Sequence, residues 1–202
     1  MYEVELKLRA DHESVRAALD DAGATLDRRV RQVDTYYDAP HRDFAETDEA
    51  LRLREEVRER LGKSGPESAT GSEERADVAD AESTTRVTYK GPLVEAKSKT
   101  REEHETAVAD GDEAAGILAG LGFEPAAVVE KDRTFFTLDG YTVSLDRVDG
   151  LGEFVEIEAE TAESDDIGEV REGAADVLRR LGFDPDDQIR TSYLGLLLDA
   201  DG

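Results

Sequence analysis

The chain has 202 residues and carries 50 Asp and Glu against 25 Lys and Arg, which gives a formal net charge of -25. This length fits one domain with a sizeable hydrophobic core. The acidic residues are spread along the whole sequence, a pattern typical of a solvated surface and not of a partner-binding tail. Molar salt shortens the electrostatic screening length to about 3 Å. Because such screening makes this surface tolerable, we expect a salt-loving source organism.

The composition also excludes several classes of function. Binding to nucleic acid needs a basic surface, and the overall charge here has the wrong sign. No stretch of about 18 residues is uncharged and apolar, and the first residues lack the apolar core of a signal peptide, so we expect a cytoplasmic protein without membrane association. The sequence has no cysteine, so any metal ion must be held by oxygen or imidazole ligands.

Apolar and charged residues alternate from Glu3 to Arg9. This two-residue period predicts a β-strand with one apolar and one charged face. The same period recurs further along the chain, near residues 51–54, 87–90 and 155–158.

Two turn sequences indicate hairpins. Asp139-Gly140 joins a strand near residues 129–138 to one near 141–148, and residues 149–152 lead into a strand at 153–160. Turns of this composition connect antiparallel strands. Several antiparallel strands are therefore expected.

Three segments share a layout in which an apolar helical period ends at a glycine and a strand with aromatic residues follows. Glycine at these positions allows a helix to stop in a left-handed cap. The glycines are Gly23, Gly122 and Gly182, and the expected strands include residues 34–37, 133–136 and 190–193. The apolar tail at residues 193–198 is expected to pack internally, with a subunit interface as the alternative.

Residues 62–84 lack aromatic residues and any period. We expect them to form a flexible insertion within a single domain that spans residues 1–202. Gly62-Lys63-Ser64 is similar to the end of a phosphate-binding loop, but Val57 stands where that motif needs a glycine. We interpret this match as accidental.

The lysines are placed selectively. The chain has only six, and five of them fall in predicted strands, so surface solubility does not explain their positions. On the charged strand faces they alternate with Arg52, Arg54, Arg101 and Arg133, and we expect these side chains to converge inside a barrel. Such a basic set can hold a chain of phosphates, because arginine gives bidentate contacts and lysine a point charge.

Carboxylates occupy the same charged faces. Pairs such as Glu3/Glu5 and Glu156/Glu158 point to one side of a strand, close enough to coordinate one hard cation, for which Mg²⁺ or Mn²⁺ fits best. A cation beside a basic cage predicts a triphosphate ligand. The alternative is an exposed sheet whose acid–base pairs cross strands at a fraction of a kcal/mol each. The acids in register with a charged face are Glu3, Glu5, Glu103, Glu105, Asp146, Glu156 and Glu158.

The ordered set of motifs resembles a known family. Glu3-Val4-Glu5-Leu6-Lys7 is similar to the N-terminal ExExK signature of the CYTH, or triphosphate tunnel metalloenzyme, proteins. Further matching segments follow in family order at residues 34–38, 50–54, 88–92, 99–103, 131–133, 144–146 and 154–158. We therefore expect an α+β fold: a closed antiparallel β-barrel that forms a tunnel, with the three amphipathic helices covering its apolar exterior.

The resemblance also implies roles for individual residues. The metal ligands would be Glu3, Glu5, Asp146, Glu156 and Glu158, with Mg²⁺ or Mn²⁺ as the ion. The triphosphate would be bound by Lys7, Arg52, Arg54, Lys90, Lys99, Arg101, Lys131 and Arg133. A homodimer is implied as well.

Other polar and aromatic residues receive weaker interpretations. Lys97 flanks a matched motif and is expected at the rim or in solvent, Glu103 and Glu105 are expected to orient neighbouring cations, and Arg147 is expected to be exposed. The pairs Tyr36/Tyr37 and Phe135/Phe136 are expected in the core. None of the three histidines, His12, His41 and His104, is a convincing general base.

The Thr-Tyr-Lys-Gly-Pro and Lys-x-Arg-x-Glu stretches are most similar to the class IV adenylyl cyclases, which implies conversion of ATP to cyclic AMP and pyrophosphate. Positioning and electrostatics would supply most of the rate, and no separate protein base is required. The alternatives are a hydrolase of inorganic, thiamine or nucleoside triphosphate that uses the same cage, and a non-catalytic triphosphate-binding protein.

Overall fold

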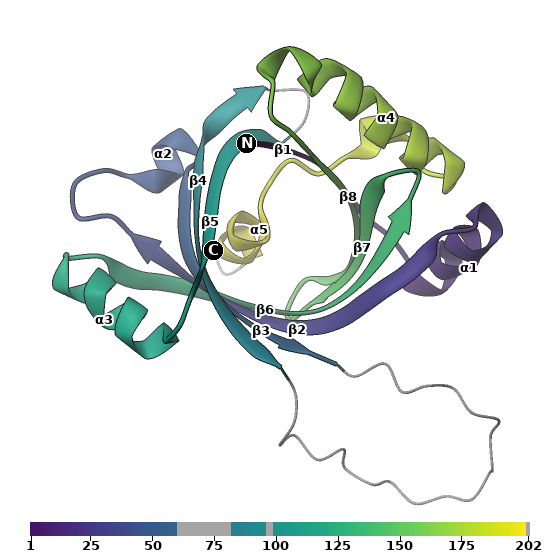
Figure 1. The fold of residues 1–202 in the computed structure, drawn as a ribbon. Helices are drawn as coiled ribbons and strands as arrows, with labels where there is room; N and C mark the ends of the chain where they lie inside the picture. Colours follow the sequence, from purple (N-terminus) through teal and green to yellow (C-terminus); the bar gives the residue numbers. More distant parts are fainter. Residues whose placement is uncertain (60–81, 96–98, 201–202) are drawn as a thin grey trace, which may run out of the picture.

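The computed structural model describes residues 1–59, 82–95 and 99–200. Eight antiparallel strands form a closed barrel in the order β1-β5-β4-β3-β2-β6-β7-β8, seen along its axis in Figure 1. The expected α+β barrel is therefore confirmed. The strands are β1 (Tyr2–Arg9), β2 (Thr25–Asp38), β3 (Ala50–Arg58), β4 (Ser83–Glu95), β5 (Thr100–Val108), β6 (Glu124–Leu138), β7 (Tyr141–Val148) and β8 (Gly152–Thr161).

Five α-helices accompany the barrel in the described part of the chain. Among these helices, none has the length and hydropathy needed to cross a membrane. The helices are α1 (His12–Ala22), α2 (Phe44–Thr47), α3 (Gly111–Gly120), α4 (Ile167–Arg180) and α5 (Tyr193–Ala200), with short 3-10 turns at Ser164–Asp166 and Pro185–Asp187.

The apolar faces of β1, β6, β7 and β8 point outward and are covered by α1 and α4, which lie on that side of the barrel in Figure 1. Leu6 and Leu8 of β1 pack in one cluster with Leu19 of α1 and Leu178 of α4. Because successive side chains of a strand point to opposite faces, this outward core obliges the charged residues between them to face the barrel interior. The interior of this barrel is consequently polar.

The helix stops and hairpins follow the predictions. Gly23, Gly122 and Gly182 have φ values of 77°, 89° and 89°, in the left-handed region that glycine adopts without strain. Asp139 and Gly140 also have positive φ and join β6 to β7. These local signals are short-range, which is why they could be recognised from the sequence.

The expected cover by three helices is correct only for α1 and α4. Helix α3 has no buried residue: Ile117 on it is 63% exposed, and Leu121, its C-cap, is 65% exposed. In Figure 1 it lies at the side of the barrel opposite α1 and α4, beyond the strands that it connects. It forms because Asp110 caps its N-terminus by accepting a hydrogen bond from the Glu113 amide, not because it buries an apolar face.

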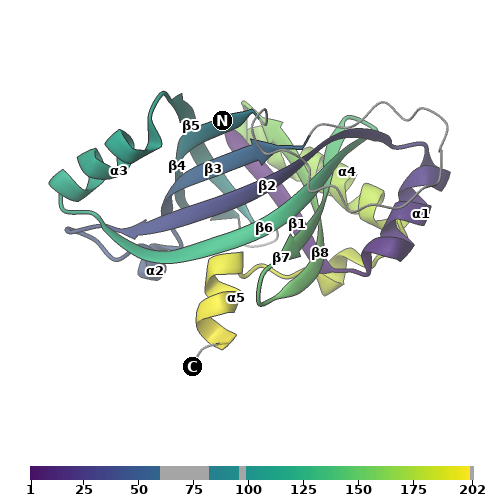
Figure 2. The same ribbon diagram turned by 90° about the horizontal axis from the view of Figure 1, so that it is seen from below.

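The expected strand at residues 190–193 is wrong. Tyr193 begins helix α5, and residues 190–192 form no strand. Every strand of the closed barrel already has two neighbours, so no edge is free to pair with a ninth strand. Helix α5 projects onto the barrel interior in Figure 1 and lies outside the strands in Figure 2, so it crosses one mouth of the barrel.

The expected insertion falls largely outside the described residues. Outside the described residues lie 60–81, which include the Gly62-Lys63-Ser64 match. Lys97 also lies outside them. Strand β4 begins at Ser83, so the last two residues of the predicted insertion belong to the barrel.

The net charge of -25 leads to a prediction about stability. Raising KCl from about 0.1 M to about 2 M is expected to increase the midpoint of thermal unfolding by several degrees, because added salt screens repulsion between surface carboxylates. Circular dichroism melts across a KCl series measure this. An unchanged or lower midpoint at 2 M KCl would contradict the expectation.

Candidate functional site

A cavity of about 670 Å³ occupies the barrel interior. This volume lies within the range of small-molecule sites. All of the cations that the sequence placed in a phosphate site line it, as do Glu3, Glu5, Glu156 and Glu158; Asp146 is not a lining residue. These eight lining cations are Lys7, Arg52, Arg54, Lys90, Lys99, Arg101, Lys131 and Arg133; Arg28, Arg58 and Arg86, for which no role was predicted, line the cavity as well.

The lining cations are buried although they are charged. The side chain of Lys7 in β1 is 2% exposed, and Lys131 and Arg133 in β6 are similarly enclosed. Transfer of such groups from water costs several kcal/mol each unless opposite charges compensate. The interior must therefore supply carboxylates as well.

Asp34 of β2 is the first compensating acid. Its fully buried carboxylate accepts hydrogen bonds from Arg54 Nε and Nη2 at 2.6 and 2.7 Å, and it lies 3.7 Å from Arg52 Nη1 and 3.5 Å from Lys131 Nζ. Burial alone would raise the pKa of Asp34, but these cations hold the pKa well below its usual range.

No role was predicted for Asp34, although it belongs to the matched segment at residues 34–38. The pairing register of β2 and β3 contains a signal for the role of Asp34. Asp34 is the direct cross-strand partner of Arg54, and directly opposed opposite charges on one sheet face attract each other.

Arg133 is the second centre of charge compensation. Its Nε donates to Asp146 Oδ1 at 2.7 Å and its Nη1 to Glu158 Oε1 at 3.1 Å, while its Nη2 contacts both Asp146 and Glu156. Burial lowers the pKa of this guanidinium, but the three acids together raise the pKa well above its usual value. Asp146 is thus held by an arginine.

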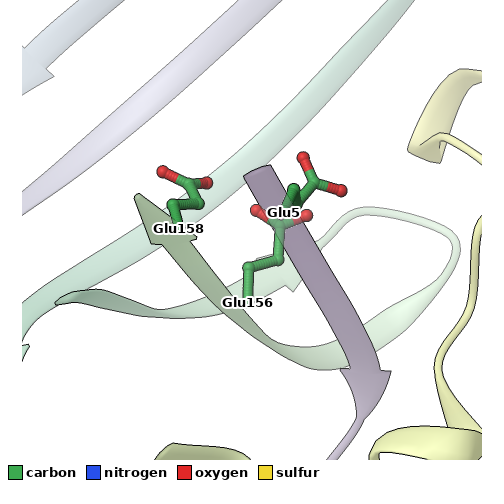
Figure 3. Close-up of side chains that lie close together, drawn as sticks. All are labelled: Glu5, Glu156 and Glu158. Carbon is green, nitrogen blue, oxygen red and sulfur yellow. The ribbon is translucent and has the colours of Figure 1, made fainter. Parts of the chain in front are cut away.

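Glu5, Glu156 and Glu158 form a carboxylate cluster in which one oxygen from each lies within 4.8 Å of the others. Figure 3 shows Glu5 on β1 beside the two glutamates of β8, and Glu5 is the direct cross-strand partner of Glu158. Burial and the neighbouring acids raise the pKa of Glu158 to about 8, against the opposing effect of Arg133. An excess of negative charge at close-set oxygens fits a hard divalent cation.

The other two acids predicted as metal ligands lie outside this cluster. Glu3 accepts a hydrogen bond from Lys90 Nζ at 2.7 Å, and Asp146 is engaged by Arg133. Glu103 also contacts Lys90, at 2.8 Å. The chain's own cations, Lys90 and Arg133, therefore neutralise these carboxylates.

Several lining cations keep unused hydrogen-bond donors. Within the described residues, Lys99 Nζ, Arg52 Nε and Arg101 Nε are buried and have no hydrogen-bond acceptor. Burial and neighbouring cations lower the pKa of Lys99 and of Lys131 to about 8. This part of the cavity is deficient in negative charge, as expected of a wall that receives an anion.

Asp48, in the turn between α2 and β3, also contacts this wall. Its half-exposed carboxylate lies 2.6 Å from Arg101 Nη2 and 3.9 Å from Lys99 Nζ. It has a φ of 55°, which aspartate tolerates better than most residues. Because the contact depends on the path of a turn, no periodic pattern could have revealed it.

The aromatic pairs are divided between the two faces. All four side chains are buried, as expected, and Tyr36 and Phe135 also line the cavity, whereas Tyr37 and Phe136 do not. Adjacent residues of a strand point to opposite faces, which makes this division necessary. Tyr193 of α5 lines the cavity as well.

None of the three histidines lines the cavity. His12 is buried elsewhere, with its Nε2 3.1 Å from the Phe154 carbonyl oxygen. Glu105 lines the cavity and contacts Thr88 and Arg52. Arg147 lies outside the cavity and is exposed, as expected. The site therefore consists of opposed charges and contains no imidazole.

Comparisons with known proteins agree with this architecture. The CYTH domain matches residues 1–193. A Methanocaldococcus jannaschii protein provisionally named an adenylate cyclase is 32% identical over 97% of this chain and 98% of its own length. The structure of the PH1819 protein from Pyrococcus horikoshii is 36% identical, with a TM-score of 0.81, over 98% of this chain and 99% of that one.

A more distant structure, from Hippeastrum, belongs to a provisionally named adenylyl cyclase described as having a dominant triphosphatase activity. It has a TM-score of 0.61 at 16% identity, over 98% of this chain and 95% of that one, and so shows the fold alone. The family match and the two archaeal relatives extend over nearly the whole chain. The chain therefore belongs to the CYTH family of metal-dependent, triphosphate-processing proteins.

Proposed function

We propose that the cavity binds a triphosphate together with a divalent metal ion, and that the protein converts ATP to cyclic AMP and pyrophosphate. One observation carries the proposal: buried cations with unused donors and a three-carboxylate cluster line the same cavity. A triphosphate–metal complex presents the complementary charges, anionic oxygens for the cations and a cation for the acids.

The proposed metal site is formed by Glu5, Glu156 and Glu158, whose oxygens fit Mg²⁺ or Mn²⁺. Glu3 and Asp146 are proposed as further ligands that would first release Lys90 and Arg133. When bound, the ion would act as a Lewis acid that stabilises negative charge on phosphate oxygens.

The proposed phosphate site comprises the lining cations. Lys99, Arg52 and Arg101 offer unused donors, and Lys131 and Arg54 surround Asp34. In the proposed reaction the ribose 3′-hydroxyl attacks the α-phosphorus and pyrophosphate leaves. The protein's part is to fix the reacting groups and to neutralise the charge that develops, which are large contributions in phosphoryl chemistry.

ATP and cyclisation are favoured by the archaeal relative, which is 32% identical and provisionally named an adenylate cyclase. A triphosphatase is the second candidate, since the same cage could serve water as the nucleophile. The Hippeastrum protein supports it only by showing that this fold admits such an activity.

The first prediction concerns the product. Incubation with ATP, tripolyphosphate or thiamine triphosphate, in molar KCl with Mg²⁺ or Mn²⁺, is expected to yield cyclic AMP and pyrophosphate from ATP alone. Chromatography of nucleotides with separate assays of pyrophosphate and orthophosphate distinguishes the candidates. Orthophosphate without cyclic AMP would establish a triphosphatase, and binding without turnover would establish a non-catalytic protein.

The second prediction concerns the metal. Glu158→Gln and Glu5→Gln are each expected to raise the Mn²⁺ concentration for half-maximal activity by on the order of 10- to 100-fold, because an amide replaces an anionic ligand. Manganese titrations of activity measure the shift. Glu130→Gln is the matched control, since this strand glutamate pairs with Arg31 outside the cavity. Equal shifts in all three variants would contradict the proposed site.

The third prediction concerns pH. Lys99 and Lys131 have pKa values of about 8, so both are charged below pH 8 and lose their charge above it. Affinity for tripolyphosphate, measured by calorimetry without divalent metal, is expected to fall between pH 7 and pH 9.5, by up to about tenfold per pH unit for each lysine. Binding near pH 8.5 should take up protons from the buffer, which makes the observed binding enthalpy more positive in buffers of high ionisation enthalpy.

Variants separate this effect from titration of the ligand itself. Lys131→Arg keeps its charge through this pH range and should flatten the decline. Lys90→Arg is the control: burial lowers the pKa of Lys90, but Glu3 and Glu103 outweigh burial and raise it, so its replacement should leave the profile unchanged. The same decline in all three proteins would show that the lysines do not cause it.

A further inference from the structure

Tyr193 enters the cavity from outside the barrel. It is the first residue of α5, the helix that crosses one mouth in Figures 1 and 2, and it is only 6% exposed. The segment before it is tied to the barrel by a backbone hydrogen bond from the Ile189 amide to the Lys7 carbonyl at 2.7 Å. Leu197 of α5 belongs to the apolar cluster that docks the helix.

The Tyr193 side chain contacts residues of four strands, β1, β6, β7 and β8. Its hydroxyl donates to Asp146 Oδ2 at 3.0 Å, and its ring lies edge-on to Phe154 at 5.0 Å between centroids. The Lys7 Nζ lies 4.4 Å and the Lys131 Nζ 5.2 Å from the ring centroid. One aromatic ring therefore receives two buried ammonium groups from β1 and β6.

This arrangement has an electrostatic consequence. Two ammonium groups near one ring repel each other, and each also has a carboxylate within reach, Glu5 for Lys7 and Asp34 for Lys131. A buried aromatic face attracts cations through its quadrupole. The ring gives both lysines a favourable position that does not use up their charge, whereas a carboxylate there would neutralise them.

We propose that Tyr193 is a positioning residue of the phosphate site: its ring holds the ammonium groups of Lys7 and Lys131 in place for an anionic ligand, and its hydroxyl bond to Asp146 fixes the ring. The proposal rests on the proposed function of the cavity. It assigns the C-terminal helix a part in the site, in place of the simple packing expected from its apolar sequence.

The experiment measures the affinity of the full chain for tripolyphosphate by calorimetry in molar KCl at pH 7 without divalent metal. Tyr193→Leu removes the aromatic face and is expected to weaken binding about tenfold. Tyr193→Phe keeps the face and is expected to stay within about threefold of the unchanged protein. In a Lys131→Ala background, Tyr193→Leu should cost clearly less, because one of the positioned charges is gone.

Two controls separate positioning from packing. Leu197→Ala shortens an apolar side chain of α5 that contacts neither lysine, while Tyr193 keeps its own hydrogen bond to Asp146. Tyr141→Phe removes a hydroxyl that donates to the Val170 carbonyl outside the cavity. Both should bind tripolyphosphate normally. Thermal unfolding of each variant shows that it is folded.

The outcomes are distinguishable. If the unchanged protein fails to bind tripolyphosphate, the proposed function of the cavity is wrong, and this proposal with it. If that protein binds but Tyr193→Leu binds equally well, or Leu197→Ala loses as much affinity as Tyr193→Leu, only the role of Tyr193 is wrong. Rescue by phenylalanine together with reduced cost in the Lys131→Ala background supports it.

Discussion

Compensation of buried charge is the constraint on which this structure depends. The outer faces of β1, β6, β7 and β8 are apolar and pack against α1 and α4, so alternation along these strands places charged residues inside. Each buried ion costs several kcal/mol unless it is paired. The interior is therefore built from interlocking ion pairs, and the barrel that positions the site is stable only if those pairs form.

The acids of the interior divide into two kinds. Asp34 is surrounded by Arg54, Arg52 and Lys131, and its low pKa shows that cations are in excess around it. At Glu158, by contrast, burial and nearby acids raise the pKa to about 8 despite Arg133. One region thus lacks anions and the other lacks cations, and this imbalance is what a metal–triphosphate complex would correct.

Much of this arrangement could be predicted from the sequence, because strand alternation is a local property. Residues such as Lys7 and Arg54 were assigned to the interior from the two-residue period together with the selective placement of the lysines, and the structure places them on the cavity wall. Alternation fixes the face of a residue but not its partner. Arg133 and Asp146 are direct partners across the β6–β7 hairpin, so their contact follows from the register that the predicted Asp139-Gly140 turn sets. The contact of Asp48 with Arg101 instead depends on how a turn and a distant strand meet in space.

The C-terminal segment shows more clearly that a local sequence pattern does not determine the contacts that a segment makes. Its similarity to the two earlier helix–glycine–strand units predicted a strand at Tyr193, but repetition in sequence carries no information about available partners. Closure of the barrel by β1 and β8 leaves no edge, so the segment folds as a helix over the mouth. The closed topology of the barrel, and not the local sequence pattern, therefore determined that this segment forms a helix.

The surface and the cavity have opposite electrostatic characters. A net charge of -25 repels any polyphosphate at long range, while the buried cations attract it only at close range. Salt screens exposed charges over distances beyond about 10 Å at 0.1 M and about 3 Å at 1 M, but it weakens interactions inside an enclosed site much less. High ionic strength should therefore remove the repulsion that opposes entry while preserving the attraction that holds the ligand. An acidic surface and a phosphate-binding interior are compatible for this reason.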